Sequence, residues 1–324
     1  NGHFEFALHL FTLMQSDGIE PTSYTLVALL KACLCLKDLE KGREIHSYVL
    51  DNGFQKNAYV GSTLIDLYSK CGCMDEARET FERLPNMHDE EIVVRNALMA
   101  GYAENGYGEE ALKRFEQMQH EGVLPNAIAY ICILKACCRI GALEKGKRVH
   151  AQVSGVNLHD KNTILGTTLV DMYAKCGALG KAQEIFDELE IHNVITWNVL
   201  ITGYAQLGEI ESVLSIIERM EREGERPNFV TFLCLLTACN HAGLVNKAPA
   251  YFNIMMQYYG IHPTQEHYIC MVELLGRAGQ LDSVVTMIEK TPFRPNLTMW
   301  CNVLDACRKW GNVVLGRAAF EHAM

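Results

Sequence analysis

The chain repeats itself, and this repetition limits its possible folds more than any other feature of the sequence. The stretch NALMAGYAENG at residues 96–106 returns as NVLITGYAQLG at residues 198–208. Two other families of segments recur, namely LKAC at 30–33 and 134–137 with LTAC at 236–239, and DLYSKCG at 66–72 with DMYAKCG at 171–177. A repeat of this size corresponds to one supersecondary unit that must stack on its neighbours to bury its apolar face. The repetition therefore predicts a solenoid.

These anchors divide the chain into eight complete segments, with a partial unit at each end in residues 1–22 and 297–324. The complete segments are 23–57, 58–91, 92–126, 127–162, 163–193, 194–228, 229–264 and 265–296. Their lengths cycle through three classes, so unlike repeats alternate in triplets. The chain begins without a methionine and stops inside an apolar helical pattern, and we expect it to be a fragment or a processed product.

Each segment predicts two helices. A stretch of apolar residues at helical spacing runs up to a glycine such as Gly72, Gly106, Gly177 or Gly208, and a second such stretch follows it. Glycine at these points supplies the left-handed residue that ends a helix. Because one helical hairpin cannot bury its apolar face alone, we expect an all-α solenoid of stacked helix-turn-helix units.

The composition argues against several classes of function. Lys31 interrupts even the apolar stretch from Leu26 to Leu36, so no membrane span and no membrane partner are expected. The 13 cysteines lie singly inside apolar stripes without any C-x-x-C spacing, which favours a reducing compartment over a disulfide scaffold or a zinc site. We therefore expect no metal and no cofactor.

The net charge of −10 is unfavourable for a nucleic-acid-binding protein, because Lys and Arg contacts to phosphates supply most non-specific affinity. A solenoid can nevertheless keep its acidic residues on the outer helices and leave a few cations in the inner groove. The charge predicts weak non-specific binding, with selectivity that comes from contacts to bases.

The repeats resemble the pentatricopeptide repeat (PPR) family, in particular the plant class in which standard (P), long (L) and short (S) repeats alternate. The resemblance implies a right-handed superhelical solenoid, with residues 1–22 as a partial P-type repeat and residues 23–296 as eight repeats in the order L-S-P-L-S-P-L-S. Residues 297–324 would be a truncated E-like helical extension. The motifs EHYICMVELLGRAG at 266–279 and WCNVLDACRKWGN at 300–312 resemble those of RNA-editing factors, which implies a location in the mitochondrion or chloroplast.

In this family, the fifth and last residues of a repeat read one RNA base, and the second residues of adjacent repeats sandwich that base. The resemblance implies that the base-reading residues are Ser62, Asn96 with Asn126, Thr167 with Asn193, and Asn198 with Asn228. The base-stacking residues would be Tyr59, Val93, Ile128, Ile164, Ile195 and Val230. Both Asn-Asn pairs imply a pyrimidine, with little choice between C and U because the last amide can turn either way. Thr167 with Asn193 implies adenine.

Each assignment has a structural alternative. The apolar second residues can be ordinary core residues near the start of a helix. Asn96 and Asn198 can be helix N-caps, and the asparagines that end the repeats can be turn residues near proline.

Some segments depart from the reading pattern. The long segments place Val27, Ile131 and Leu233 at the fifth position, and because such side chains cannot pair with a base edge, we expect these repeats to be spacers. Segment 58–91 carries Ser62 but ends in Glu91, which predicts a degraded reader.

Four cations, Lys70, Arg139, Lys175 and Arg277, fall at the expected ends of first helices. The family resemblance implies that they lie near RNA phosphates. The alternative is compensation of the helix dipole, which contributes about 0.3–1 kcal/mol for each cation.

No catalytic constellation is found. His88-Asp89-Glu90 matches the H-x-E half of the zinc deaminase signature, but the chain contains no P-C-x-x-C, and we expect a solvated loop there. The chain is thus expected to be no enzyme but a sequence-specific single-stranded RNA-binding module of an organellar RNA-processing factor. In C-to-U RNA editing it would present a cytidine to a deaminase-domain protein or editing cofactor in trans. The alternative is a protein-binding α-solenoid subunit of an organellar ribosome or transcription complex.

Overall fold

The computed structural model describes residues 3–84, 91–155 and 162–323 of the chain. Within these ranges all regular secondary structure is helical, in 19 α-helices and one short 3₁₀ helix, η1 (Phe54–Lys56). The expectation of an all-α protein is confirmed. The expected H-x-E loop at residues 88–90 lies outside the described residues.

Two sets of helices alternate along the chain. The first helices of the helical pairs are α2 (Ser23–Leu36), α4 (Ala58–Lys70), α6 (Glu91–Glu104), α8 (Ala127–Ile140), α10 (Thr163–Lys175), α12 (Val194–Gln206), α14 (Phe229–Ala242), α16 (Gln265–Arg277) and α18 (Leu297–Trp310). The second helices are α1 (Phe4–Ser16), α3 (Leu39–Asp51), α5 (Met74–Arg83), α7 (Gly108–His120), α9 (Leu143–Gly155), α11 (Leu179–Glu188), α13 (Ile210–Arg222), α15 (Ala248–Gln257), α17 (Leu281–Glu289) and α19 (Val313–Ala323).

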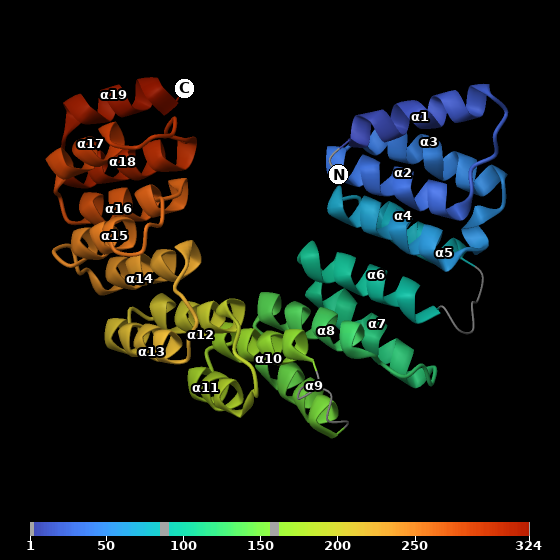
Figure 1. Cartoon of the computed structure of the whole chain (residues 1–324), viewed down its shortest axis with the longest axis horizontal. Coiled ribbons are helices and arrows are strands. Elements are labelled where there is room, and N and C mark those ends of the chain that lie inside the picture. The colour runs from blue at the N-terminus through green and yellow to red at the C-terminus, as the bar shows by residue number, and fades with distance from the viewer. Residues whose placement is uncertain (1–2, 85–90, 156–161, 324) are drawn as a thin grey trace. The chain divides into compact units, whose positions relative to one another are not determined.

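The chain forms two compact units, Asn1–Met172 and Tyr173–Met324. In the first unit, the first helices α2, α4, α6 and α8 pack in chain order, each on the next, and their second helices pack against them. In the second unit, α12, α14, α16 and α18 pack in the same way. This ladder of first helices can be followed inside each unit in Figure 1.

Glycine has two separate roles in this arrangement. The predicted left-handed glycines are confirmed, with φ of 78° at Gly72, 85° at Gly106, 80° at Gly177 and 71° at Gly208. Gly101 lies inside α6, where a Cβ atom would lie only 2.2 Å from the Ser69 hydroxyl oxygen of α4. Glycine at this position therefore lets two neighbouring first helices approach closely.

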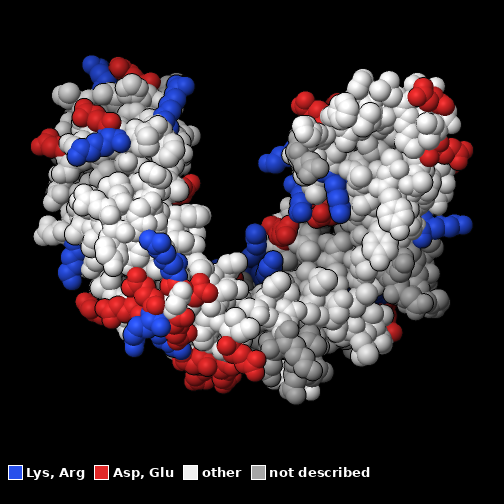
Figure 2. Space-filling view, viewed as in Figure 1, with Lys and Arg blue, Asp and Glu red and all other residues white. Residues whose placement is uncertain are grey.

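Acidic residues concentrate on the second helices. The first helices α8, α12 and α14 contain no Asp or Glu, whereas the second helix α5 alone contains Asp75, Glu76, Glu79 and Glu82. In Figure 2, acidic side chains gather over α11 and α13. This distribution agrees with the expected separation of charge between inner and outer helices. No helix within the described ranges is long and apolar enough to cross a membrane.

Candidate nucleic-acid interface

The apolar second residues lie near the starts of the first helices and are largely exposed. The exposed fraction is 58% for Tyr59, 57% for Ile128, and 67% for both Ile164 and Ile195. Val93 and Val230, which had the same expected role, are half-buried. Core residues are buried, whereas these four side chains are more than half exposed. The alternative that they belong to the core is therefore wrong. Within each unit, these exposed side chains are available to a ligand.

The asparagines that end the repeats are helix N-caps. Asn126 Oδ1 accepts from the backbone N–H of Ala129 at 3.0 Å, and so begins α8. Asn228 Oδ1 accepts from the backbone N–H of Thr231 at 3.1 Å and begins α14 in the same manner. An asparagine side chain is among the strongest N-caps, because its oxygen satisfies an amide that has no partner inside the helix.

The fifth-position asparagines are not caps but lie inside helices, buried beside those caps. Asn96 in α6 and Asn198 in α12 are 5% and 6% exposed. Asn96 Nδ2 donates to Asn126 Oδ1 at 3.1 Å, and Asn198 Nδ2 donates to Asn228 Oδ1 at the same distance. The N-cap alternative for Asn96 and Asn198 is therefore wrong. In both segments the structure brings together the two residues that were expected to read one base.

The cap fixes the orientation of the last amide. Because Oδ1 of Asn126 and of Asn228 must face backbone N–H donors, the NH₂ group of each side chain is turned away from the helix. These two NH₂ groups have no hydrogen-bond partner among the described residues. The expectation that the last amide can turn either way is thus wrong, since turning it would break the helix cap. Each amide presents a donor to a ligand.

In the first unit the predicted residues line one open pocket of about 410 Å³. Its walls include Tyr59, Ser62, Val93, Asn96, Asn126 and Ile128. The volume falls in the range of small-molecule sites, about 300–1,000 Å³, which suits a single nucleobase. Three base-reading and three base-stacking candidates, predicted on three successive segments, thus share one cavity.

Two predicted base-reading residues, Ser62 and Thr167, donate their hydroxyl groups to backbone carbonyls of their own helices. The Ser62 hydroxyl donates to the backbone carbonyl of Tyr59 at 3.1 Å, and the side chain of Glu91, its expected partner, lies outside the described residues. The Thr167 hydroxyl donates to the Thr163 carbonyl at 2.8 Å inside its own helix. Thr167 belongs to the first unit and Asn193 to the second, so their pairing remains a prediction.

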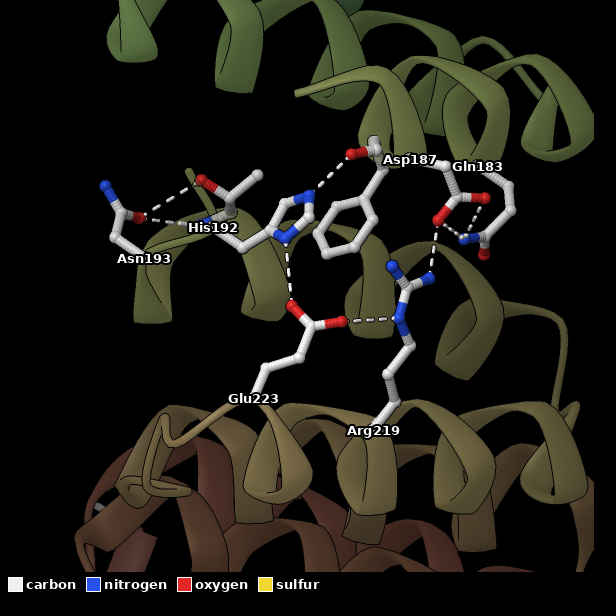
Figure 3. A network of polar contacts seen from close by, with 8 residues as sticks. Gln183, Asp187, His192, Asn193, Arg219 and Glu223 are labelled. Atoms are coloured by element: carbon white, nitrogen blue, oxygen red, sulfur yellow. Dashed lines mark hydrogen bonds and ion pairs between the residues drawn. The ribbon is translucent and has the colours of Figure 1, made fainter. Parts of the chain in front are cut away.

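Asn193 is held by a network that the sequence did not reveal (Figure 3). Its Oδ1 caps α12 by accepting from the backbone N–H of Thr196 at 3.0 Å. The preceding residue, His192, contacts the Phe186 carbonyl through Nε2 at 2.6 Å and the Glu223 carboxylate through Nδ1 at 3.1 Å. The imidazole also stacks on the Phe186 ring, with the two ring centroids 4.1 Å apart.

Arg219 of α13 completes this network. Its guanidinium donates to Glu223 at 2.8 Å and to Asp187 of α11, and the bond to Asp187 raises the pKa of Arg219. The same group lies 5.5 Å from the ring centroids of both Phe186 and Trp197. The residue before Asn193 is therefore tied to α11 and to the residue that caps the end of α13, which fixes the start of α12. Neither His192 nor Arg219 belongs to a repeated motif, so repeat alignment could not indicate them.

The four predicted phosphate cations all lie in the last turn of a first helix, where they also compensate the helix dipole. Lys70 forms an ion pair with Asp66 at 3.3 Å, and Arg277 donates to the Asn240 side chain at 3.3 Å. Arg139 and Lys175 are exposed. These contacts fit both explanations, so the phosphate role remains a prediction.

A second open pocket, of about 540 Å³, lies between α16 and α18. It is lined by Arg277 together with Arg308 and Lys309, two cations that the sequence analysis missed. Lys309 Nζ donates to the backbone carbonyl of Arg277 at 3.0 Å. Their position in the last turn of α18, equivalent to that of Arg277 in α16, is the signal that could have identified them.

His267 is another residue that the sequence did not indicate. It is fully buried, contacts the Thr264 hydroxyl through Nδ1 at 2.8 Å, and contacts the Phe229 carbonyl through Nε2 at 2.8 Å. Burial lowers the pKa of His267, which favours the neutral ring that these contacts require. His46 is a packing histidine, since its Nδ1 contacts the Tyr68 hydroxyl at 2.8 Å.

The described residues contain no group of three or more His, Cys, Asp and Glu side chains that could hold a metal ion. No disulfide joins any of the 13 cysteines, all of which lie in the described ranges, and burial raises the pKa of Cys33 and Cys132 to about 11. These two thiols are therefore packing groups of the core.

Stacked helical pairs, with a capping asparagine hydrogen-bonded to a polar residue of the preceding first helix, define the chain as an α-solenoid repeat protein. The PPR repeat family matches residues 90–139 and 192–241, and the PPR repeat matches residues 62–87, 167–194 and 230–258. The chain belongs to the pentatricopeptide repeat family.

Similar proteins extend this comparison. The chain is 36% identical to the pentatricopeptide repeat-containing protein At2g33680 of Arabidopsis thaliana, over 100% of this chain and 44% of that protein. It is 36% identical to the protein CRR2, chloroplastic, over 98% of this chain and 49% of that protein. It is 35% identical to At2g03880, mitochondrial, over 97% of this chain and 48% of that protein. Both of these are also from Arabidopsis thaliana. The chain thus spans about half the length of these curated relatives, or less.

Among solved structures, the chain is similar to the pentatricopeptide repeat protein PPR10 in complex with an 18-nt psaJ RNA element. The TM-score is 0.76 over 99% of this chain and 48% of that chain, at 16% sequence identity. This similarity establishes the solenoid fold of stacked helical pairs.

Proposed function

We propose that the chain is a sequence-specific single-stranded RNA-binding module. The observation that supports this most is the hydrogen bond of 3.1 Å that joins the fifth residue to the last residue in segments 92–126 and 194–228. In each segment this bond leaves an outward NH₂ donor close to exposed apolar side chains at the second positions. A polar edge beside apolar surfaces is the arrangement that recognises an unstacked base.

The proposed register follows the chain from its N-terminus with RNA running 5′ to 3′. Segment 92–126 reads a pyrimidine, segment 127–162 leaves its base unread, segment 163–193 reads adenine, and segment 194–228 reads a pyrimidine. Asn193 presents an NH₂ donor, because its Oδ1 caps α12, and this donor can match N1 of adenine. The long segment 127–162 reads no base because its fifth residue, Ile131, offers no polar group.

The finer part of the proposal concerns RNA editing. The resemblance of the segments to P, L and S repeats, and of residues 297–324 to an E-like extension, supports a role in recognising C-to-U editing sites, with the deaminase or an editing cofactor supplied in trans. Relatives named chloroplastic and mitochondrial support a location in one of these organelles. On this proposal the chain itself positions RNA and catalyses no reaction.

The test compares matched and scrambled single-stranded RNA at two salt concentrations. The matched RNA is the sequence that the purified chain enriches from a randomised library. We expect tight binding only to the matched strand, with a shallow dependence on salt because few Lys and Arg residues lie near the groove. Equal affinity for both strands, falling steeply with salt, would overturn the proposal. Absence of RNA binding would favour the protein-binding solenoid.

A further inference from the structure

The two Asn-Asn pairs have the same reading residues but differ in one buried contact. Asn198 Oδ1 accepts from the Thr231 hydroxyl at 2.7 Å, and Thr231 is fully buried. The equivalent oxygen of the other pair, Asn96 Oδ1, is buried and has no hydrogen-bond partner among the residues that the structure describes. The cause is the third residue of the next segment, which is Ala129 in place of a threonine.

The hydroxyl of Thr231 completes a closed set of hydrogen bonds. It accepts from the backbone N–H of Asn228 at 3.1 Å and donates to Asn198, whose NH₂ group in turn donates to Asn228 Oδ1. Every polar atom of the Asn198 amide that faces the protein is therefore engaged in a fixed orientation. In the other pair, the bond to Asn126 is the only one that holds the Asn96 amide within the described part of the chain.

We infer that Thr231 is a positioning residue that sets the choice between cytosine and uracil in segment 194–228, and that Ala129 relaxes this choice in segment 92–126. The inference rests on the proposed function. It concerns residues outside the fifth and last positions, so the same reading pair would have two different selectivities in one chain.

The argument depends on the edges of the two pyrimidines. Cytosine offers an acceptor at N3, which matches the outward NH₂ donor of Asn228 or Asn126, whereas uracil offers a donor, N3–H. To accept from that donor, the protein must turn an amide oxygen toward the base. The last asparagine cannot turn without losing the helix cap, so the oxygen must come from the fifth residue.

The cost of turning differs between the two segments. If Asn198 turns, it loses its bonds to both Thr231 and Asn228. If Asn96 turns, it loses only its bond to Asn126, and its unpartnered oxygen gains a donor. Binding of uracil therefore breaks one hydrogen bond fewer in segment 92–126 than in segment 194–228. We expect the preference for cytosine over uracil to be roughly fivefold larger in segment 194–228, the effect of one neutral hydrogen bond.

The experiment measures the affinity of the whole chain for RNAs that carry C or U at either of the two pyrimidine positions of its selected target. Thr231→Val, which keeps the volume without the hydroxyl, should lower the C/U ratio roughly fivefold at its own position and leave the other position unchanged. Thr231→Ser keeps the hydroxyl and should preserve the ratio. Ala129→Ser adds a hydroxyl and should raise the C/U ratio of segment 92–126.

Asn228→Asp serves as the control, because a carboxylate accepts only and should favour uracil at that position. If Asn228→Asp shifts the preference but neither Thr231→Val nor Ala129→Ser changes a ratio, the positioning role is wrong and the proposed function stands. If Asn228→Asp has no effect either, base reading by this segment is wrong as well. Because Ala129→Ser is a gain of selectivity, a folding defect in Thr231→Val cannot produce the expected pattern.

Discussion

The reader segments and the long segments share a helix cap and differ at the residue beside it. Asn57, which ends a long segment, accepts from the backbone N–H of Tyr59 at 3.0 Å and of Val60 at 3.1 Å, as Asn126 does from Ala129. In a reader segment the cap also accepts from a buried asparagine such as Asn96. In a long segment the fifth residue is apolar, so that contact is missing.

On the proposed function, a capping asparagine has a structural role in both kinds of segment and acquires a reading role only beside a polar fifth residue. The cap oxygen is used by the helix in both cases. What changes is whether a second polar group, the buried side chain of the fifth residue, lies next to the cap. The comparison can therefore be tested by removing the fifth residue, by removing the cap, and by altering the long segments.

The largest effect is expected from converting a reader into a spacer. Asn198→Val should remove the base preference at its own nucleotide, a loss of about 1–3 kcal/mol in discrimination. The matched control is Asn96→Val, which should affect only the nucleotide read by segment 92–126. Affinities for RNAs that vary at either position provide the measurement. A loss spread equally over both positions would mean that neither residue reads a particular base.

Removal of the cap should separate its two roles. Asn57→Ala and Asn228→Ala should each lower the free energy of unfolding by about 1 kcal/mol, because each leaves a backbone amide without its partner. Denaturant unfolding measures this loss. Only Asn228→Ala should also change base preference. The comparison between the two kinds of segment fails if Asn57→Ala changes base preference as strongly as Asn228→Ala does.

A smaller effect is expected at the end of the first helix in the long segments. Two of these helices end at a left-handed glycine, Gly141 and Gly243, but the third ends at Lys37 with φ of 56°. Lys37→Gly should raise the free energy of unfolding by about 0.5–1 kcal/mol, because glycine adopts this conformation without steric cost. Thermal unfolding of the variant beside the parent tests this, and a lower midpoint would contradict it. RNA affinity should stay unchanged.

No change is expected when the fifth residue of a long segment is made polar alone. Leu233→Thr, Val27→Thr and Ile131→Thr should not alter base preference at any position, since these segments are proposed to be spacers. Selection from a randomised RNA library with each variant is the measurement. A clear new preference in any of them would contradict the spacer assignment.

The fold was accessible from the sequence because helix ends are encoded locally. Glycines such as Gly106 and capping asparagines such as Asn126 recur at fixed places. Such local signals can be recognised in the sequence without knowledge of tertiary contacts. The residues of the pocket in the first unit were also predictable, since the repeat brings equivalent positions together.

Other features depend on contacts that no local pattern records. The orientation of the Asn126 amide follows from the helix cap. Whether Asn198 Oδ1 has a hydrogen-bond donor depends on the presence of threonine at residue 231. His192 and Arg219 hold the start of α12 through contacts with the Phe186 carbonyl and with the carboxylates of Glu223 and Asp187. Such contacts join residues far apart in the chain, so repeat alignment could not reveal them.

The central claim, that a polar pair reads one base, is tested most directly at segment 163–193. The measurement is the affinity of the chain for four RNAs that differ only at the nucleotide assigned to Thr167 and Asn193, before and after the double change Thr167→Asn with Asn193→Asp. The parent should prefer adenine. The variant should prefer uracil, because its carboxylate accepts from N3–H, with a swing of about 1–3 kcal/mol. A parent without preference for adenine, or a variant that keeps it, would contradict base reading by this segment.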